Sequence, residues 1–382
     1  MTDRGRLWHR LFLRASLSST QLFAWIFVFQ YFISLYGALE PATVSLALTY
    51  ALTQAITILM APIAALTLGN GYRRPMIFAV VSLAAAFAAL SNTFGADATQ
   101  PAWGIAGFAV LMGLYRAFYW APYRVSLQHN PGRNPLWSEY VLALLPVVAG
   151  FVLDGGGVFA VVLLAAASAL ALMSLFPLFG MRDAHEGYAW GYRETFHQLF
   201  VGAHVRTTLS SIMHGLEMSL LLIVWPIIVF VILGWSYALL GIVLSLIYVF
   251  SLILRSIIHR PMMRLSPPTR ALFAASAWVM RLSVAGSVGI ILIDTYYYGG
   301  SNAASRGFDM MTLEHAADNT TYVDEYTVLK EISMALGRLI MSLIVALLVS
   351  NISITYSFAI VFFIGALAAA SGILLSAKKA RS

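Results

Sequence analysis

The basic residues of this chain alternate with long apolar segments. Four of the 23 Lys and Arg residues lie inside those segments, and the other 19 fall in every second gap between them. The gaps around residues 40, 97, 155, 233, 287 and 351 contain no Lys or Arg. Loops rich in Lys and Arg stay on the cytoplasmic side of a membrane. The pattern therefore predicts a multi-pass helical membrane protein with an even number of spans and both termini in the cytoplasm.

Composition excludes several other classes of protein. Hydrophobic residues make up 60% of the chain and charged residues 10%, whereas a soluble domain has roughly 25% charged residues. The net charge of +7 comes from residues that flank the spans, so we expect membrane lipids as partners and no nucleic acid. The chain has no Cys, and its 8 His residues are scattered. Motifs for ATP binding or hydrolysis are absent. We therefore expect no metal, no cofactor and no enzymatic activity.

The apolar segments predict an all-α integral membrane protein with twelve transmembrane helices in two pseudo-repeats of six. The expected spans are 18–39, 43–67, 75–95, 102–123, 138–156, 157–179, 207–231, 234–258, 270–286, 288–308, 325–349 and 352–376. Spans nine and ten are the least regular, because charged residues interrupt them. A ten-span alternative treats part of that stretch as re-entrant.

The spans group into five divisions. We expect a basic amphipathic amino-terminal segment on the cytoplasmic membrane surface, a six-helix bundle, a cytoplasmic linker with an amphipathic helix, a second bundle and a basic tail. Their bounds are 1–17, 18–180, 181–206, 207–376 and 377–382. The two bundles share a weak repeat: an aromatic cluster around Tyr119 precedes Glu139-Tyr140, and another around Tyr297 precedes Glu325-Tyr326. Two parallel repeats with a site between them are a known transporter architecture.

Two short motifs carry a resemblance to a known family. Residues 64–74 read A-A-L-T-L-G-N-G-Y-R-R; Gly71, Arg73 and Arg74 match the loop between spans two and three of the major facilitator superfamily. In this motif Ala64 replaces a Gly, and Leu68 replaces an Asp that would form a charge-relay latch. Residues 145–150 read L-P-V-V-A-G, where Pro146 and Gly150 match the fifth-span motif of many exporters of that family.

The chain thus resembles the major facilitator superfamily over essentially its full length, as a divergent prokaryotic-type member. The resemblance implies that spans one, four, seven and ten line a central cavity. It also implies alternating access, in which the two bundles rock about a central site. The fifth-span motif implies export, and hence antiport.

Charged residues inside spans are expensive in hydrocarbon and usually face a protein interior or a water-filled path. Asp294 lies in the middle of span ten. Desolvation favours the protonated form of a lone carboxyl group there, unless a cation lies close. Asp294 is therefore either a proton-coupling group or half of a static ion pair with Arg281 of span nine.

Glu217 and His214 lie three residues apart in span seven and so share a helical face. They either relay a proton or lock span seven to its neighbours. Arg116 of span four either binds a carboxylate or phosphate group of a solute or pairs with an acidic residue across the cavity. In span eleven, Glu331 is a functional candidate, although Glu331 and Arg338 are more typical of a buried structural network.

Polar and aromatic residues of the central spans could line a site for an amphipathic organic molecule. The candidates are Gln21, Trp25, Gln30, Tyr31, Gln54, Tyr115, Tyr119, Trp225 and Tyr296. Singly, each is more typical of packing or of the interfacial belt. The basic loop after span four and the acidic loop after span ten could also attract each other at the cytoplasmic mouth.

Together these features predict a secondary active transporter of a small organic solute, coupled to protons through Asp294 and Glu217. The solute is anionic if Arg116 binds it. We expect a monomer in the bacterial inner membrane. A lipid or drug exporter, and a non-transporting membrane enzyme or assembly component, remain as alternatives.

Overall fold

The computed structural model describes residues 2–94, 101–129, 136–180, 183, 187–300 and 325–377, and these form helices and connecting turns without a β-strand. The first bundle contains α1 (Thr2–Tyr36), α2 (Leu39–Leu66), α3 (Arg73–Thr93), α4 (Pro101–His129), α5 (Leu136–Asp154), α6 (Gly157–Met173) and α7 (Leu175–Phe179), with a short turn η1 (Thr67–Asn70) after α2. The linker carries α8 (Tyr192–Gln198). The second bundle contains α9 (Gly202–Ser219), η2 (Leu220–Val224), α10 (Trp225–Ile232), α11 (Tyr237–Arg264), α12 (Pro267–Met280), η3 (Arg281–Ser283), α13 (Gly286–Gly300), α15 (Glu325–Asn351) and α16 (Ile354–Ala377).

Ten helical segments in the described ranges are long and apolar enough to cross a membrane, so the chain is a multi-pass membrane protein. The expected spans nine and ten correspond to α12, which has 14 residues, and α13, which has 15. α12 is shorter than the roughly 20 residues that a straight span needs, because Arg281 ends it in a tight 3₁₀ turn. α13 is described only as far as Gly300, where the described range ends.

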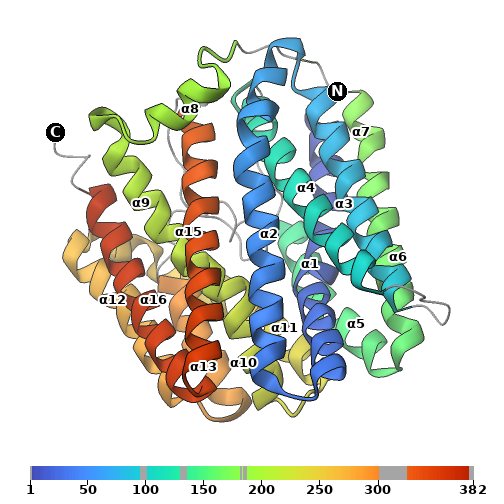
Figure 1. Ribbon diagram of the computed structural model, residues 1–382, viewed down its shortest axis with the longest axis vertical. Helices are drawn as coiled ribbons and strands as arrows, with labels where there is room; N and C mark the ends of the chain where they lie inside the picture. The colour runs from blue at the N-terminus through green and yellow to red at the C-terminus, as the bar shows by residue number, and fades with distance from the viewer. Residues whose placement is uncertain are drawn as a thin grey trace.

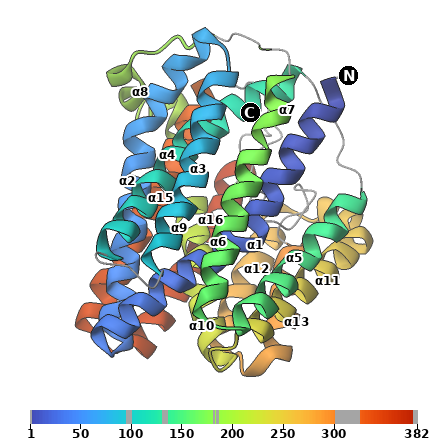
Figure 2. The same cartoon turned by 90° about the vertical axis from the view of Figure 1, so that its right-hand side faces the viewer.

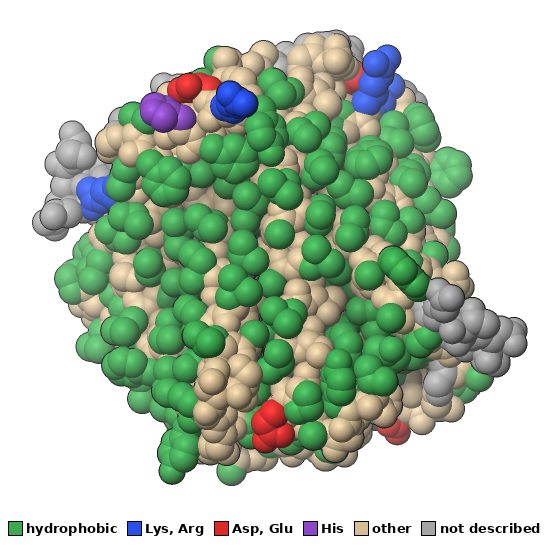
Figure 3. Space-filling model, in the orientation of Figure 1, with side chains coloured by type: hydrophobic (Ala, Val, Ile, Leu, Met, Phe, Trp, Pro, Cys, Tyr) green, Lys and Arg blue, Asp and Glu red, His purple; other side chains and the backbone are tan. Residues whose placement is uncertain are grey.

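The surface has the charge distribution of a membrane protein. In Figure 3, apolar side chains cover a broad central belt, basic side chains lie near the end that carries α8, and acidic side chains lie at both ends. Large apolar residues are strongly exposed in this belt, including Val158 and Phe176, each 76% exposed. Such exposure is unfavourable in water but suits a face that contacts lipid.

The basic amino-terminal segment is continuous with the first span. One helix, α1, runs from Thr2 to Tyr36 without a break near residue 17. Arg6, His9 and Arg14 of this segment are buried, with at most 5% of each residue exposed. The segment expected on the membrane surface therefore packs inside the bundle along α6 and α7.

The two bundles meet through two antiparallel helix pairs, α2 with α15 and α5 with α11. Figure 1 shows α2 and α15 side by side at the centre of the molecule, and both marked chain ends lie towards the end that carries α8. Figure 2 shows α5 and α11 together on another side. The approach of α5 to α11 is close: a Cβ on Gly150 would lie 2.4 Å from the Tyr237 carbonyl oxygen, and one on Gly241 would lie 2.3 Å from that of Pro146. Pro146 and Gly150, singled out from the sequence, thus lie where the two bundles touch.

The predicted span seven is an interrupted helix. Its first part, α9, leads into a five-residue π-helical turn, η2, before α10 continues. Pro226 lies in the first turn of α10. Because it has no backbone N–H, the regular series of helical hydrogen bonds is interrupted there. Turns of this kind inside helices are frequent at functional sites.

Candidate functional site

A cavity lies between the two bundles and is lined mostly by apolar side chains. Its volume is about 60 Å³. At roughly 10–15 Å³ for each water molecule, it has room for a few waters. The walls come from α1, α5, η2, α10, α11 and α13, with Ser18, Tyr248, Asp294 and Tyr298 as polar groups. Its walls come from both bundles, so relative movement of the bundles would change its size.

Asp294 meets Arg281 at the wall of this cavity. Arg281 Nη2 donates to Asp294 Oδ1 at 2.7 Å and Nε donates to the same oxygen at 3.2 Å. Trp225 Nε1 donates to the other carboxylate oxygen at 2.8 Å. The side chains of Arg281 and Asp294 are 0% and 5% exposed. The carboxylate therefore has a cation and a neutral donor in contact, all within the second bundle.

Three aromatic rings surround the Arg281 guanidinium. Its central carbon lies 4.3 Å from the Trp278 ring centroid, 4.7 Å from that of Tyr297 and 5.1 Å from that of Trp225. A guanidinium over ring faces is attracted by their electron density, most strongly when it is desolvated. These rings from α10, α12 and α13 hold Arg281 against Asp294.

The same rings connect this pair to Glu217 of α9. Glu217 Oε1 accepts hydrogen bonds from Tyr297 Oη at 2.6 Å and from Trp278 Nε1 at 3.1 Å. His214 Nδ1 lies 3.7 Å from Glu217 Oε2. The structure thus brings Asp294, Arg281, Glu217 and His214, four residues predicted separately, into one network across α9, α12 and α13.

A second buried ion pair lies in the first bundle and contacts the second. Arg14 of α1 donates to both carboxylate oxygens of Glu139 of α5, at 2.8 and 2.7 Å. Tyr248 of α11 donates its hydroxyl to Glu139 at 2.7 Å. Tyr248 belongs to the second bundle and also borders the cavity. Glu139 therefore joins two helices of one bundle to a helix of the other.

Aromatic and polar residues close the outer side of the interface. The Tyr237 hydroxyl donates to Gln30 of α1. The Trp235 ring stacks on Phe29 with centroids 6.1 Å apart and an interplanar angle of 2°. Trp235 has a φ of 64°, a left-handed conformation that places the ring in the turn between α10 and α11. Gln30 thus faces the other bundle, above the cavity.

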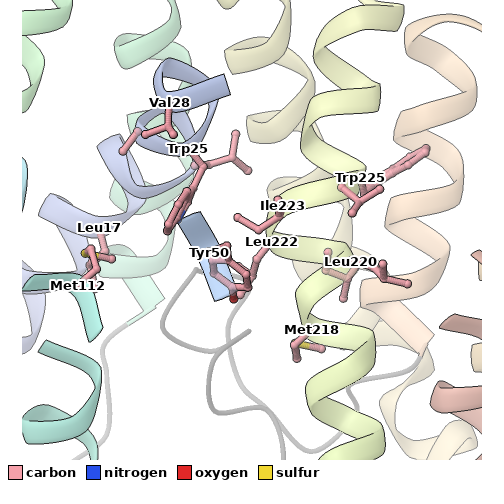
Figure 4. Close-up of a cluster of buried hydrophobic side chains, with 14 of the residues drawn as sticks. Leu17, Trp25, Val28, Tyr50, Met112, Met218, Leu220, Leu222, Ile223 and Trp225 are labelled. Atoms are coloured by element: carbon pink, nitrogen blue, oxygen red, sulfur yellow. The ribbon is translucent and has the colours of Figure 1, made fainter. Parts of the chain in front are cut away.

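Arg116 and Trp25 meet on Tyr50 of α2. Arg116 Nη1 donates to the Tyr50 hydroxyl at 3.3 Å, and its guanidinium lies 5.5 Å from the ring centroid. Trp25 packs edge-on against the Tyr50 ring with centroids 5.1 Å apart. Figure 4 shows the Trp25 ring extending towards Tyr50, opposite Leu222 and Ile223 of η2. These groups form a buried polar and aromatic cluster inside the first bundle.

Other predicted cavity residues lie elsewhere. Tyr296 faces α12, where its hydroxyl shares a hydrogen bond with Ser276 at 2.9 Å and its ring stacks on Phe273. Tyr31 packs on Phe32. The rings of Tyr115 and Tyr119 pack against each other at a tilt, with centroids 5.4 Å apart, and Tyr119 lies beside buried His9.

The His9 contacts fix its tautomer. His9 Nδ1 donates to the Ser174 carbonyl oxygen at 2.8 Å, because a carbonyl can only accept. Nε2 then accepts from the Tyr119 hydroxyl at 3.2 Å. Tyr119 is thus tied to α1 and α7 rather than directed at the cavity.

The linker meets the motif loop between α2 and α3. Gly71 has a φ of +94°, and a Cβ there would lie 2.4 Å from the Asp183 carboxylate. Asp183 accepts from the Arg73 backbone N–H at 3.2 Å, at the amino terminus of α3, where a negative charge is favoured. Arg74 is exposed. A carboxylate from the linker therefore stands beside the loop that lacks the motif's own Asp.

The linker also contacts α2 and α15. The Tyr192 hydroxyl donates to the Leu59 carbonyl oxygen at 3.3 Å, and the Ala189 N–H donates to the Glu325 carboxylate at 3.1 Å. Burial raises the pKa of the Tyr188 phenol to about 12, and its hydroxyl shares a hydrogen bond with Thr195. These contacts fasten the linker to one helix from each bundle.

Glu331 of α15 pairs with Arg124 of α4 at 3.5 Å, which is a further contact between the bundles. Arg338 lies two turns further along α15 and is 3% exposed. Lys330 is also buried, at 8% exposure. The basic loop residue Arg133 and the acidic loop 309–324, for which attraction was predicted, lie outside the described residues, as does the tail 378–382.

Sequence reasoning missed several groups at this site. Arg14 was counted among the topology-setting basic residues, and Glu139 was noted only as part of a repeat. Glu139 did carry a signal, since it is one of few acidic residues next to an expected span. Trp278, Tyr297 and Tyr248 carried none, because an aromatic residue in an apolar helix is ordinarily a packing residue.

Comparisons with known proteins identify the fold. No protein-family model matches the chain, and no curated protein matches its sequence. Solved structures do match over nearly the whole length. A D-xylose–proton symporter has a TM-score of 0.63 at 13% identity, covering 96% of each chain. A POT family transporter in complex with 5-aminolevulinic acid has 0.62 at 11%, covering 100% of this chain and 97% of that one. The nucleoside transporter NupG has 0.56 at 11%, covering 98% of both.

These neighbours are transporters of the major facilitator type. The chain has the major facilitator fold. At these identities the likeness concerns the fold alone, and the expectation from the sequence motifs is confirmed at that level.

Proposed function

We propose that the protein is a secondary active transporter that moves a small organic solute by alternating access. The observation that carries the proposal is the cavity between the bundles, with a buried Arg281–Asp294 pair on its wall, in a fold shared with solute transporters. Contacts hold the bundles together both at Gln30 and Tyr237 and at Arg14, Glu139 and Tyr248. A solute reaches the cavity only when one of these sets separates.

The proposal includes twelve spans with both termini in the cytoplasm. The chain is described without a gap from α11 through α12 and α13, which supports the twelve spans. Two helices joined at η3 can each cross the membrane when they pack against longer neighbouring helices. The basic residues near α8 support the orientation. We place the protein in the bacterial inner membrane as a monomer.

Proton coupling is proposed at Asp294, with Glu217 as its partner in the network. An Asp294 proton would remove the charge that Arg281 balances, leaving the guanidinium with its three rings and free to bind another acceptor. Glu217 lies on the far side of the same rings. Protonation of one carboxylate thereby changes the electrostatic environment of the other within a water-poor interior.

The test is transport in proteoliposomes with Asp294→Asn beside the wild type. The probes are D-xylose and uridine, with and without an imposed pH gradient. We expect the wild type to accumulate a probe only with the gradient. Asp294→Asn should retain exchange of labelled for unlabelled probe but lose accumulation; retained exchange shows that the variant is folded. Accumulation by Asp294→Asn equal to that of the wild type would remove Asp294 from coupling.

A second candidate function is the export of a largely apolar molecule, such as a lipid or a drug. The apolar lining of the cavity, which includes Leu22, Phe23 and Val229, favours it. The Pro146 and Gly150 motif points the same way. Transport of a fluorescent lipid or dye out of inverted vesicles, with no uptake of either hydrophilic probe, would favour this candidate over the first.

A further inference from the structure

Two buried polar side chains inside the first bundle have no use in the network around Asp294. We propose that Trp25 and Gln54 form a solute subsite for an uncharged group that both donates and accepts hydrogen bonds, such as a hydroxyl or a carboxamide. This inference rests on the proposed transport function and names the chemistry that the site recognises.

The subsite lies one helical turn along α1 from the central cavity, although neither Trp25 nor Gln54 itself lines that cavity. Leu22 of α1 lines the cavity, and Trp25 lies three residues later on the same helical face. The Trp25 ring contacts Tyr50, and Gln54 follows Tyr50 by one turn of α2, which places their Cβ atoms about 5–6 Å apart. Trp25, Tyr50 and Gln54 therefore form a continuous surface from α1 to α2, and in Figure 4 the labelled pair Trp25 and Tyr50 lies opposite η2.

Both polar groups are desolvated and unpartnered within the described part of the chain. Gln54 is 0% exposed and Trp25 is 3% exposed. Neither the amide nitrogen nor the amide oxygen of Gln54 makes a hydrogen bond to any residue that the structure describes, and the same holds for Trp25 Nε1. Buried polar groups are nearly always hydrogen-bonded, because a buried donor or acceptor without a hydrogen bond lowers the stability of the fold. Two such residues, joined through one tyrosine, point to a binding role.

The chemistry of the two groups selects the ligand. An indole N–H can only donate, whereas a carboxamide both donates and accepts. A carboxylate would satisfy the N–H groups but leave the Gln54 oxygen without a donor. A hydroxyl or carboxamide satisfies all three positions. In the second bundle the charge of Asp294 is balanced by Arg281, so the facing wall does not require a charged solute either.

The test uses substitutions that remove the polar atoms and leave an apolar side chain: Trp25→Phe and Gln54→Leu, measured by thermal shift and by transport KM. The matched control is Tyr296→Phe, which removes a hydroxyl that contacts Ser276 away from the cavity. The probes are two neutral and anionic pairs, D-xylose with D-xylonate and uridine with orotidine.

We expect a neutral probe to stabilise the wild type and its anionic counterpart to do so less. Gln54→Leu should unfold at the same temperature as the wild type or higher, because the amide atoms removed have no hydrogen-bond partner among the described residues. Trp25→Phe should unfold at a somewhat lower temperature, because it also removes ring contacts with Tyr50 and Phe108. Each variant should also bind the neutral probe at least about tenfold more weakly and raise its KM, while Tyr296→Phe leaves both unchanged. A lower unfolding temperature for Gln54→Leu without probe would mean that the amide bonds the chain itself, and would overturn the proposal.

The remaining outcomes distinguish failure of the subsite from failure of the transport function. If the anionic probes bind best and the variants keep that binding, the solute is anionic, as Arg116 alone suggested, and the subsite is wrong. Unchanged KM in both variants refutes the subsite while the transport function stands. Probe binding that needs Trp25 and Gln54, without movement of the probe under any gradient, instead refutes transport and keeps the subsite. A wild type that no neutral probe shifts counts against the subsite.

Discussion

The ion pairs Arg281–Asp294 and Arg14–Glu139, both buried, differ in what they connect. Arg281 and Asp294 lie within one bundle, enclosed by rings of that bundle. Arg14 and Glu139 lie in the other bundle but share Tyr248 with the opposite one. When two bundles rock as rigid bodies, an interaction inside one of them persists, whereas an interaction across their boundary must break and reform. The first pair can therefore respond to a proton or solute, while the second responds to the position of the bundles.

The largest effect is expected from removing the cation of the enclosed pair. Arg281→Met leaves Asp294 buried with Trp225 as its remaining donor, which should lower the free energy of unfolding by about 3–5 kcal/mol. Asp294→Asn should also destabilise, and the double variant should lose less than the sum of the two, because neither charge is then stranded. Unfolding of the four proteins in mixed micelles measures this cycle. Additive losses would show that the two residues are not coupled.

The bridging pair should instead control the exposure of the cavity. Glu139→Gln weakens the contacts to Arg14 and Tyr248, which should disfavour the closed arrangement by about 1.5–3 kcal/mol and raise access about tenfold or more. The chain contains no cysteine, so Ser18→Cys on the cavity wall supplies a single reporter for a water-soluble maleimide. Glu217→Gln, inside one bundle, is the matched control. Equal labelling rates in both variants would erase the distinction between the pairs.

The smallest effect is expected where the bundles touch through backbone alone. A Cβ at Gly241 would lie 2.3 Å from the Pro146 carbonyl oxygen, so Gly241→Ala should push α11 from α5 at a net cost of about 1 kcal/mol. Gly289→Ala is the control, because its Cβ would have its nearest contact at 3.6 Å. The unfolding temperature and Ser18→Cys labelling measure the result. A more stable Gly241→Ala protein would mean that the helices are not held by this close approach.

The sequence predicted the features that depend on local patterns. The apolar segments and the alternation of loops with and without Lys and Arg predicted a membrane protein. The motifs and the two-bundle organisation predicted the fold. The contact of Arg281 with Asp294 was foreseeable because the two residues are only 13 apart on adjoining helices. Even there the pattern could not say whether the pair is static or titrates, and the structure leaves that role as a proposal.

Contacts between residues far apart in the sequence could not be predicted, because they depend on which helices become neighbours. Arg14 reads as one more topology-setting residue until α1 is placed beside α5, where Glu139 meets it. Asp183 stands beside Gly71 although more than a hundred residues separate them, so a motif judged incomplete in one loop gains a carboxylate from another. Gln54 is one of many polar residues in apolar helices, and its burial without a hydrogen-bond partner among the described residues distinguishes it.

The π turn η2 sets the angular register of the seventh span. A regular helix advances each residue by about 100°, so one additional residue in a turn rotates everything that follows by roughly that angle relative to what precedes. Glu217 lies before η2 and Trp225 directly after it, yet both reach the network around Arg281. Deleting one residue from Leu220–Val224 would keep the composition of the span and its length almost unchanged. It would also turn these two side chains away from each other, so the frame of the helix is itself part of the site.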